Sequence, residues 1–267
     1  MPQRFEGRSV IVTGAGAGIG KAITERLLTE GAAVLAVDKV PDGLRTLPTS
    51  DRLVTHNQDV TEEDAPRMIV DLCLRHFGKI HVLVNNAGVG AAPRLHDTSD
   101  ADFDRYIDIN LRSMFRLSRE ALPHLKRTRG NVLNIASVMG THGMATQAPY
   151  AAAKGGVVAF TRQFAAEYGP EGVRANAIAP GMILTPGTAG RFATGAYQAR
   201  LIGVTPLQRY GSAEELASAA VFFCSDDASY VTGQILAVDG GASSSIFISD
   251  PIADLWAEKY DAEHSSA

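Results

Sequence analysis

The stretch Thr13-Gly14-Ala15-Gly16-Ala17-Gly18-Ile19-Gly20 decides the fold of this 267-residue chain. It follows the apolar run Val10-Ile11-Val12 and precedes residues 19–30, whose apolar side chains recur at helical spacing. A strand that turns through glycines into a helix directs several backbone N–H groups and the positive end of the helix dipole at one point. Because such a point suits a pyrophosphate, the turn predicts a dinucleotide site.

The glycines of this turn have separate expected roles. Gly14 permits the tight turn, Gly18 lets a cofactor approach the backbone, and Gly20 lets the helix pack closely on the sheet. We expect Gly14, Gly18 and Ile19 to contact the cofactor. The spacing is G-x-x-x-G-x-G and not the commoner G-x-G-x-x-G, so a tight turn without a ligand is the alternative interpretation.

Strands and helices alternate along the rest of the chain. Strands are predicted at residues 33–37, 53–54, 80–84, 131–136, 175–179 and 235–238, and helices at 150–168 and 213–224. A further helix is expected after Thr61, with Thr61 as its cap and Asp64 in a capping-box position. Strands buried on both faces and alternating with helices predict an α/β fold. We expect one domain over residues 1–267, a Rossmann-type doubly wound parallel sheet of about seven strands with helices on both faces.

Composition excludes several classes of function. The formal net charge of −4 gives no basic footprint for nucleic acid. No apolar run is long enough to span a bilayer and no signal peptide begins the chain, so we expect a cytoplasmic protein without a membrane partner. Cys73 and Cys224 lie in apolar helical stretches and are expected to be buried, reduced thiols. Histidines and cysteines show no metal-ligand spacing, so no metal is assigned.

Asp38 closes the second predicted strand, about 20 residues past the turn, where a carboxylate accepts hydrogen bonds from the ribose hydroxyls. The same carboxylate would repel a 2′-phosphate, which favours NAD over NADP. Lys39 follows directly and could attract the phosphate, but neighbours in a strand alternate faces, so we expect Lys39 to point away. A solvated acid at the end of a strand is the alternative interpretation of Asp38.

Tyr150 and Lys154 are spaced i, i+4 on a predicted helix and therefore share a face. A free tyrosine has a pKa of about 10, and a nearby ammonium favours the phenolate, so this pair predicts a general acid/base for an alcohol proton. Ser137 ends the fifth predicted strand, at the edge where open α/β sheets place their sites. Its hydroxyl is expected to hold the substrate oxygen.

Taken together, these motifs resemble the short-chain dehydrogenase/reductase family in its compact, single-domain branch. The resemblance runs from about Gly7 to Gly241. It rests on Thr13–Gly20, Asp59-Val60, Asn85-Asn86-Ala87-Gly88, Asn110, Ser137, Tyr150–Lys154 and Pro180–Thr185. The segment from Asp38 to Asp59 is short for the family, so the helix usually found there is expected to be a turn.

The resemblance implies further roles at positions that match the family pattern. Lys154 would also bind the nicotinamide ribose, and Asn110 would hold a water that completes a proton relay through Lys154. Assembly as a homotetramer would use the helices near residues 111–125 and 150–168. The cofactor would be lined by Asp59, Val60, Asn86, Ala87, Gly88, Pro180, Gly181, Ile183 and Thr185.

Substrate contacts are expected around the reactive trio. The residues expected at the substrate pocket are Met139, His142, Met144, Met182 and Phe192, with core fillers or a plain loop histidine as the alternatives. Residues 185–206 are glycine-rich and predict a substrate lid. Residues 242–267 form a C-terminal extension, in which Ser249-Asp250-Pro251 is typical of a helix start. That helix would pack on its own lid or on a neighbouring subunit, with a frayed terminus as the alternative.

The sequence thus predicts an NAD-dependent dehydrogenase for an apolar secondary alcohol, cyclic or aromatic, or for the matching ketone. One alternative is a 3-oxoacyl carrier-protein reductase that uses NADPH. Another is a non-catalytic dinucleotide sensor, which would not need Ser137, Tyr150 and Lys154. Epimerases of the extended branch share the tyrosine and lysine but carry a larger substrate domain.

Overall fold

Parallel strands form the centre of the computed structural model, which describes residues 3–144, 146–192, 203–248, 254 and 258. The sheet has 7 strands in the order β3-β2-β1-β4-β5-β6-β9, and every pairing is parallel. The strands are β1 (Ser9–Thr13), β2 (Ala33–Asp38), β3 (Leu53–Asn57), β4 (Val82–Asn85), β5 (Asn131–Ile135), β6 (Arg174–Pro180) and β9 (Ile235–Val238). The predicted doubly wound sheet is therefore confirmed.

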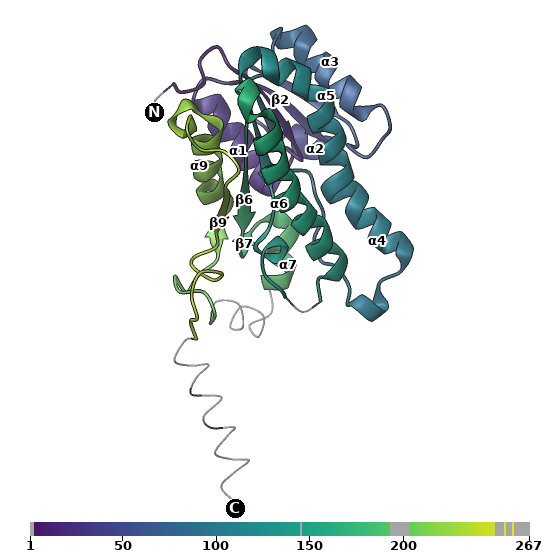
Figure 1. Ribbon diagram of the computed structural model, residues 1–267, viewed down its shortest axis with the longest axis vertical. Coiled ribbons are helices and arrows are strands. Elements are labelled where there is room, and N and C mark those ends of the chain that lie inside the picture. Colours follow the sequence, from purple (N-terminus) through teal and green to yellow (C-terminus); the bar gives the residue numbers. More distant parts are fainter. Residues whose placement is uncertain (1–2, 145, 193–202, 249–253, 255–257, 259–267) are drawn as a thin grey trace, which may run out of the picture.

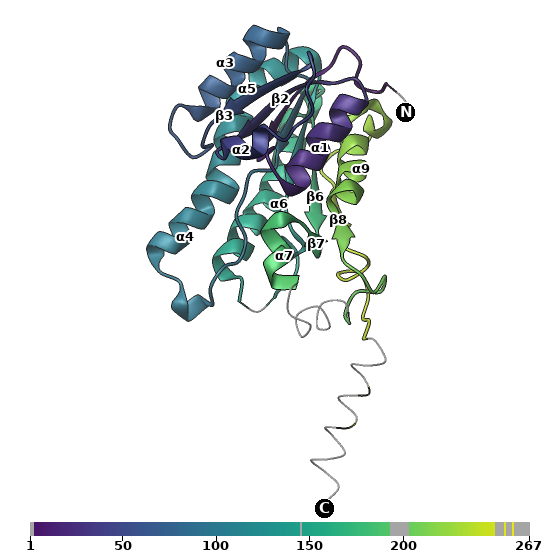
Figure 2. The same ribbon diagram turned by 180° about the vertical axis from the view of Figure 1, so that it is seen from behind.

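Helices cover both faces of this sheet (Figures 1 and 2). One face carries α1 (Gly18–Thr29), α2 (Pro41–Leu44) and α9 (Ala213–Cys224). The other carries α3 (Ala65–Phe77), α5 (Ser113–Thr128) and α6 (Ala148–Tyr168), with α4 (Asp100–Ile107) against α6. Between β2 and β3 the only helix is the 4-residue α2, as expected from the short segment there.

Alternation along the central strands builds two separate cores. Val10 and Val12 of β1 pack beneath α1 and α9, whereas Ile11 between them packs beneath α3 and α5. Successive side chains of a strand point to opposite faces, so a run such as SVIVT is buried throughout. At about 25 cal/mol per Å² of apolar surface, this two-sided burial is the main stabilising term of the fold.

The predicted capping box at Thr61 is wrong. Helix α3 begins at Ala65 with Asp64 as its N-cap, and no side chain caps it. The Thr61 hydroxyl instead donates to Asp59 Oδ1 at 2.7 Å, and the Thr61 backbone N–H donates to the same oxygen at 2.9 Å. The competing turn at Asp59 therefore takes the hydroxyl that was expected to cap the helix.

The structure also contains short elements near the carboxyl edge that periodicity does not reveal. β7 (Ile183–Leu184) pairs with β8 (Gly211–Ser212) in a 2-stranded parallel sheet, and α7 (Pro186–Phe192) follows β7. Within the predicted lid, residues 193–202 lie outside the described residues. The predicted terminal helix lies outside them too, apart from Asp254 and Glu258, which are helical and exposed.

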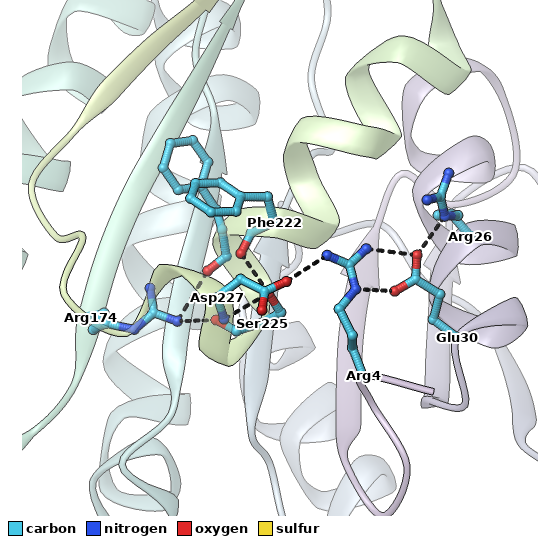
Figure 3. A network of polar contacts seen from close by, with 8 residues as sticks. Arg4, Arg26, Glu30, Arg174, Phe222, Ser225 and Asp227 are labelled. Atoms are coloured by element: carbon cyan, nitrogen blue, oxygen red, sulfur yellow. Dashed lines mark hydrogen bonds and ion pairs between the residues drawn. The ribbon is translucent and has the colours of Figure 1, made fainter. Parts of the chain in front are cut away.

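The amino edge of the sheet is closed by a network of ion pairs (Figure 3). Glu30 is buried at the end of α1, and its carboxylate accepts from Arg4 at 2.6 and 2.8 Å and from Arg26 at 2.6 Å. Arg4 also donates to Asp227 at 2.9 Å. Burial opposes ionisation of Glu30, but the two guanidinium groups outweigh it and hold the pKa of Glu30 below its usual value.

We predict that Gly20→Ala strongly destabilises the protein. A Cβ at Gly20 would overlap the Gly14 carbonyl oxygen, which belongs to a turn that cannot shift without disturbing β1. Overpacking of this kind costs about 3 kcal/mol. Gly190→Ala is the matched control, because Gly190 lies in α7 outside the left-handed region and a Cβ there would meet no atom within 4 Å. Urea unfolding of both variants tests this, and equal stability would contradict it.

Candidate active site

A cavity of about 440 Å³ opens at the carboxyl edge of the sheet. Residues at or just beyond the ends of β1, β2, β4, β5 and β6 line it, because parallel strands all end at this edge. Residues predicted to bind a cofactor that line it are Gly14, Gly18, Ile19, Asp38, Asp59, Val60, Asn86, Ala87, Gly88, Tyr150, Lys154, Pro180, Gly181, Ile183 and Thr185. Residues far apart in the sequence are thus gathered in one place.

The start of α1 forms one wall of the cavity. Its N-cap residue, Ala17, makes no side-chain capping bond, and the first turn contains no acidic residue. The first backbone N–H groups of a helix need acceptors from outside the helix. A Cβ at Gly18 would lie 3.2 Å from Thr185 Cβ, so only glycine leaves space between these two walls. An uncapped helix start beside a narrow gap fits the pyrophosphate of a dinucleotide.

Asp38 is the last residue of β2 and lines the cavity beside the glycine turn. Its carboxylate accepts from the backbone N–H of Gly16 at 2.8 Å and from that of Val40 at 2.9 Å. The expectation that Lys39 points away is wrong, because β2 ends at Asp38 and Lys39 also lines the cavity. Lys39 Nζ lies 3.9 Å from Asp59 Oδ2, a loose ion pair.

Asp59 is ionised more readily than an ordinary aspartate. Partial burial opposes its charge, but hydrogen bonds from Thr61 and the positive charge of Lys39 outweigh this and lower the pKa of Asp59. Two carboxylates, Asp38 and Asp59, therefore stand near one exposed ammonium at this end of the cavity.

Asn86 holds the glycine turn in place. Its side-chain Nδ2 donates to the carbonyl oxygens of Thr13 at 2.9 Å and of Gly14 at 3.0 Å. The Thr13 hydroxyl in turn accepts from the backbone N–H groups of Asn86 and Ala87, both at 3.1 Å. The ends of β1 and β4 are thereby joined through polar groups that face one another. Asn86 thus shapes the cavity through the turn in addition to lining it.

Ser137, Tyr150 and Lys154 line the same cavity, Ser137 from the end of β5 and the other two from α6. Ser137 is buried just after β5, and its Oγ accepts from the backbone N–H of Met139 at 3.2 Å. Tyr150 is half-buried in the first turn of α6. Lys154 Nζ lies 5.8 Å from the centroid of the Tyr150 ring, so its charge acts on that ring at short range.

Lys154 is a buried cation for which the described residues provide one hydrogen-bond acceptor. Its Nζ donates to the carbonyl oxygen of Ile135 at 2.7 Å. Burial lowers the pKa of the Lys154 ammonium to about 8, because the charged form loses its hydration. An ammonium with this pKa exchanges protons readily near neutral pH, as a proton relay requires.

Asn110 lies beside this lysine on a distorted stretch of helix. Residues 108–112 form a π-helical turn between α4 and α5. Asn110 Oδ1 accepts from the backbone N–H of Val89 at 3.1 Å, and its Nδ2 donates to Tyr106 O at 3.0 Å. A Cβ at Gly88 would press on Asn110 Oδ1 and contact Lys154 Nζ. All four predicted catalytic residues therefore line the same cavity, and the π-helical turn is a frequent feature of functional sites.

Only some of the residues predicted to contact the substrate line the cavity. Met139 and Met182 line the cavity, but His142 and Met144 do not. Both are exposed, and the His142 ring nitrogen pairs with the neighbouring Thr141 hydroxyl at 2.9 Å. Both residues follow the 3₁₀ turn at Val138–Gly140, which packs closely on α6. Phe192 ends α7, and its side chain lies outside the described part of the structure.

Gln147 is a lining residue that the sequence did not reveal. It is the N-cap residue of α6, one turn before Tyr150, and its Oε1 accepts from the backbone N–H of Ala92 at 3.3 Å. Tyr106 also holds this loop, through a hydrogen bond of 3.2 Å from its hydroxyl to the Gly90 carbonyl oxygen. Only its place three residues before the tyrosine could have drawn attention to Gln147.

Comparisons with known proteins agree with this geometry. A family model described as enoyl-(acyl carrier protein) reductase matches residues 14–243. The 3-oxoacyl-[acyl-carrier-protein] reductase of Thermotoga maritima is 37% identical over 244 residues, 89% of this chain and 98% of that protein. The cis-4-hydroxycyclohexanecarboxylate dehydrogenase of Sinomonas cyclohexanicum is 39% identical over 249 residues, 90% of this chain and 98% of that protein. A crystal structure of levodione reductase is 38% identical with a TM-score of 0.85, covering 91% of this chain and all of that one (100%).

Two classes of feature were not found among the described residues. None of the helices in the described part of the chain is both long and apolar enough to cross a membrane. Within the same residues, no three His, Cys, Asp or Glu side chains gather in a way that would hold a metal ion.

We predict that Lys154→Met stabilises the ligand-free protein at pH 7, although it removes the ammonium expected to act in the proton relay. The folded-state pKa of about 8 lies below the unfolded value of about 10.4, so the charge disfavours folding below pH 8. Between these values the unfolded chain binds more protons, and wild-type stability rises with pH by up to about 3 kcal/mol.

The stability gap between Lys154→Met and the wild type should therefore narrow from pH 7 to pH 9.5 in urea unfolding. Lys79→Met, at an exposed lysine, is the control and should show no such trend. A Lys154→Met variant that is less stable than the wild type at pH 7 would mean that the buried charge is compensated.

Proposed function

The chain belongs to the short-chain dehydrogenase/reductase family, and we propose that it is an NAD-dependent oxidoreductase for a secondary alcohol or the matching ketone. Its relatives are oxidoreductases of that family, which supports alcohol or ketone oxidoreduction. The observation that carries the proposal is that Ser137, Tyr150 and Lys154 share one cavity with the uncapped start of α1. A proton-transfer group and a dinucleotide cradle are thus joined in one space.

We assign the proton chemistry to residues of this chain. When bound, the nicotinamide supplies or accepts the hydride. Ser137 binds the oxygen of the reacting carbon, and Tyr150 takes the alcohol proton in oxidation or returns it in reduction. Lys154 favours the tyrosinate by its positive charge and binds the cofactor ribose. Asn110 holds a water molecule, and Lys154 exchanges protons with solvent through that water.

We propose NAD as the cofactor because of the charges near the adenosine end. The Asp38 carboxylate lies on the glycine turn, at 2.8 Å from the Gly16 nitrogen. A 2′-phosphate about 4 Å from this group would cost about 4 kcal/mol at an effective dielectric near 20. Lys39 offsets part of this repulsion, but it is exposed and already faces Asp59.

For the substrate we propose an apolar cyclic or aromatic secondary alcohol, or its ketone. Met139 and Met182 give the cavity a flexible apolar lining. One relative is named for a hydroxycyclohexanecarboxylate substrate, which supports a six-membered ring but not the absence of charge.

A 3-oxoacyl carrier-protein reductase is the second candidate. The relative from Thermotoga maritima has that name, and Lys39 lines the cavity on the same side as Asp38. This candidate requires preference for NADPH and turnover of acyl thioesters, so the cofactor test below also decides between the two. A sensor without catalysis would bind the cofactor and turn over nothing.

We further propose that the protein assembles as a homotetramer or at least a dimer. An apolar hollow between α5 and α6 is lined by Leu111, Phe115, Gly156 and Phe160, with Ile107 and Arg112 at its border. Phe115 is 43% exposed, although it packs edge-on against Phe160. Burying such a face against a second copy removes apolar surface from water. We also propose that the protein works in the cytoplasm.

Tyr150→Phe should lower turnover by at least about 100-fold, because it removes the group that carries the proton and keeps the ring. NAD binding should change much less. Tyr230→Phe, at a fully exposed tyrosine, is the control and should retain wild-type turnover. NADH absorbance with a panel of cyclic, aromatic, sugar and acyl-thioester alcohols provides the measurement. Turnover of Tyr150→Phe near the wild-type rate would refute the assignment.

The wild-type enzyme should prefer NAD to NADP by at least about tenfold in kcat/KM, a modest share of the electrostatic repulsion. Asp38→Ala should shrink or reverse this preference, because the repulsion disappears while Lys39 remains. Asp38→Asn tests the charge alone, since it retains an acceptor for a backbone N–H. Asp51→Ala removes an exposed charge outside the cavity lining and serves as the control. Equal use of both cofactors by the wild type would favour the reductase candidate.

A further inference from the structure

Gln147 stands out because the proposed proton chemistry does not use it. It lines the cavity together with Tyr150, three residues further along α6. Residues three apart lie on one side of a helix, with Cβ atoms about 5–6 Å apart. Their side chains therefore leave the start of α6 at points roughly as far apart as two groups on opposite sides of a six-membered ring.

The two ends of the Gln147 amide have different surroundings. The backbone N–H of Ala92 is a donor, so the atom that faces it at 3.3 Å must be the oxygen Oε1. The NH₂ group then points away from this loop. Among the residues that the structure describes, none accepts a hydrogen bond from it, although Gln147 is half-buried. The amide is thus anchored through its acceptor and offers its donors to the cavity.

The neighbouring lining decides which kind of acceptor fits these donors. Met139, Met182, Val89 and Ala91 contribute apolar atoms. In the described lining the positive side chains are Lys39 and Lys154. Lys39 pairs with Asp59, and Lys154 lies close to the Tyr150 ring. A substrate carboxylate beside Gln147 would lose its hydration without gaining a positive partner, which is costly. An uncharged oxygen loses less and gains a hydrogen bond.

We propose that Gln147 selects substrates by donating a hydrogen bond from Nε2 to a second, uncharged oxygen. This oxygen belongs to a carbonyl, hydroxyl or ester group across the molecule from the carbon that reacts at Tyr150. The preferred class is then a cyclic ketone or alcohol with a second neutral oxygen, of which 1,4-cyclohexanedione is a simple probe. The inference rests on the proposed function, because it takes hydride transfer at Tyr150 as given.

The experiment measures kcat/KM for NADH-dependent reduction of cyclohexanone, 1,4-cyclohexanedione and 4-oxocyclohexanecarboxylate by the full-length protein. The quantity of interest is the ratio of dione to cyclohexanone, compared between variants, because the intrinsic reactivity of each ketone then cancels. Gln147→Met removes both the donor and the acceptor. Gln147→Glu keeps an acceptor for the Ala92 N–H and removes the donor. Gln163→Met and Gln163→Glu are matched controls at an exposed glutamine of α6 outside the cavity lining.

Both Gln147 variants should lower the ratio by about fivefold to tenfold, the effect of one hydrogen bond, while the Gln163 variants keep it. A lower ratio in Gln147→Met alone would show that the amide only holds the Ala92 loop, and this would overturn the inference. An unchanged ratio in both, or a wild type that prefers the carboxylate to the dione, would overturn it as well. Failure of the wild-type protein to reduce any ketone would instead overturn the proposed function, which distinguishes the two failures.

Discussion

The carboxyl edge of the sheet, where the candidate active site lies, depends on the hydrogen bonds that the side-chain amide of Asn86 donates. This amide joins two carbonyl oxygens at the end of β1 to the start of the segment that follows β4. Without it, the carbonyl oxygens of Thr13 and Gly14 would lose this hydrogen-bond donor, and Gly14 would no longer be held against Gly20. The cofactor turn and the loop toward the substrate are therefore one mechanical unit, although they are more than 70 positions apart in sequence (|i−j| of 72 for Asn86 and Gly14).

The loop that follows Asn86 extends this unit toward the substrate. Asn110, Tyr106 and Gln147 each hold one backbone group of residues 89–92. These three side chains come from α4, the π-helical turn and the start of α6, so the loop is fixed from several sides. A site that must orient a substrate to fractions of an ångström needs such support. The same close packing buries Lys154, and the loss of hydration of its charge destabilises the folded state.

Much of the fold followed from the sequence because its signals are local. The glycine turn, the apolar strands and the i, i+4 spacing of Tyr150 and Lys154 depend on neighbouring residues, and the structure gathers them as expected. What could not be predicted depends on distant partners. Gln147 is anchored by Ala92, 55 positions away, and Glu30 by Arg4, 26 positions away. The predicted cap at Thr61 was wrong because Asp59 competes for its hydroxyl. The predicted substrate contact of His142 was wrong because sequence spacing does not show which way a loop side chain points.

The ion-pair network at the amino edge has a practical consequence for handling the enzyme. Arg4 ties the first described residues to Glu30 and Asp227, on the side of the sheet opposite the cavity (Figures 1 and 3). A support or fusion partner attached ahead of residue 3 would therefore be held away from the mouth of the cavity. Residues 239–248, in contrast, follow β9 at its carboxyl end, on the cavity side of the sheet. Immobilisation through the N-terminus should leave the catalytic edge open to solution, with the network as a rigid mount.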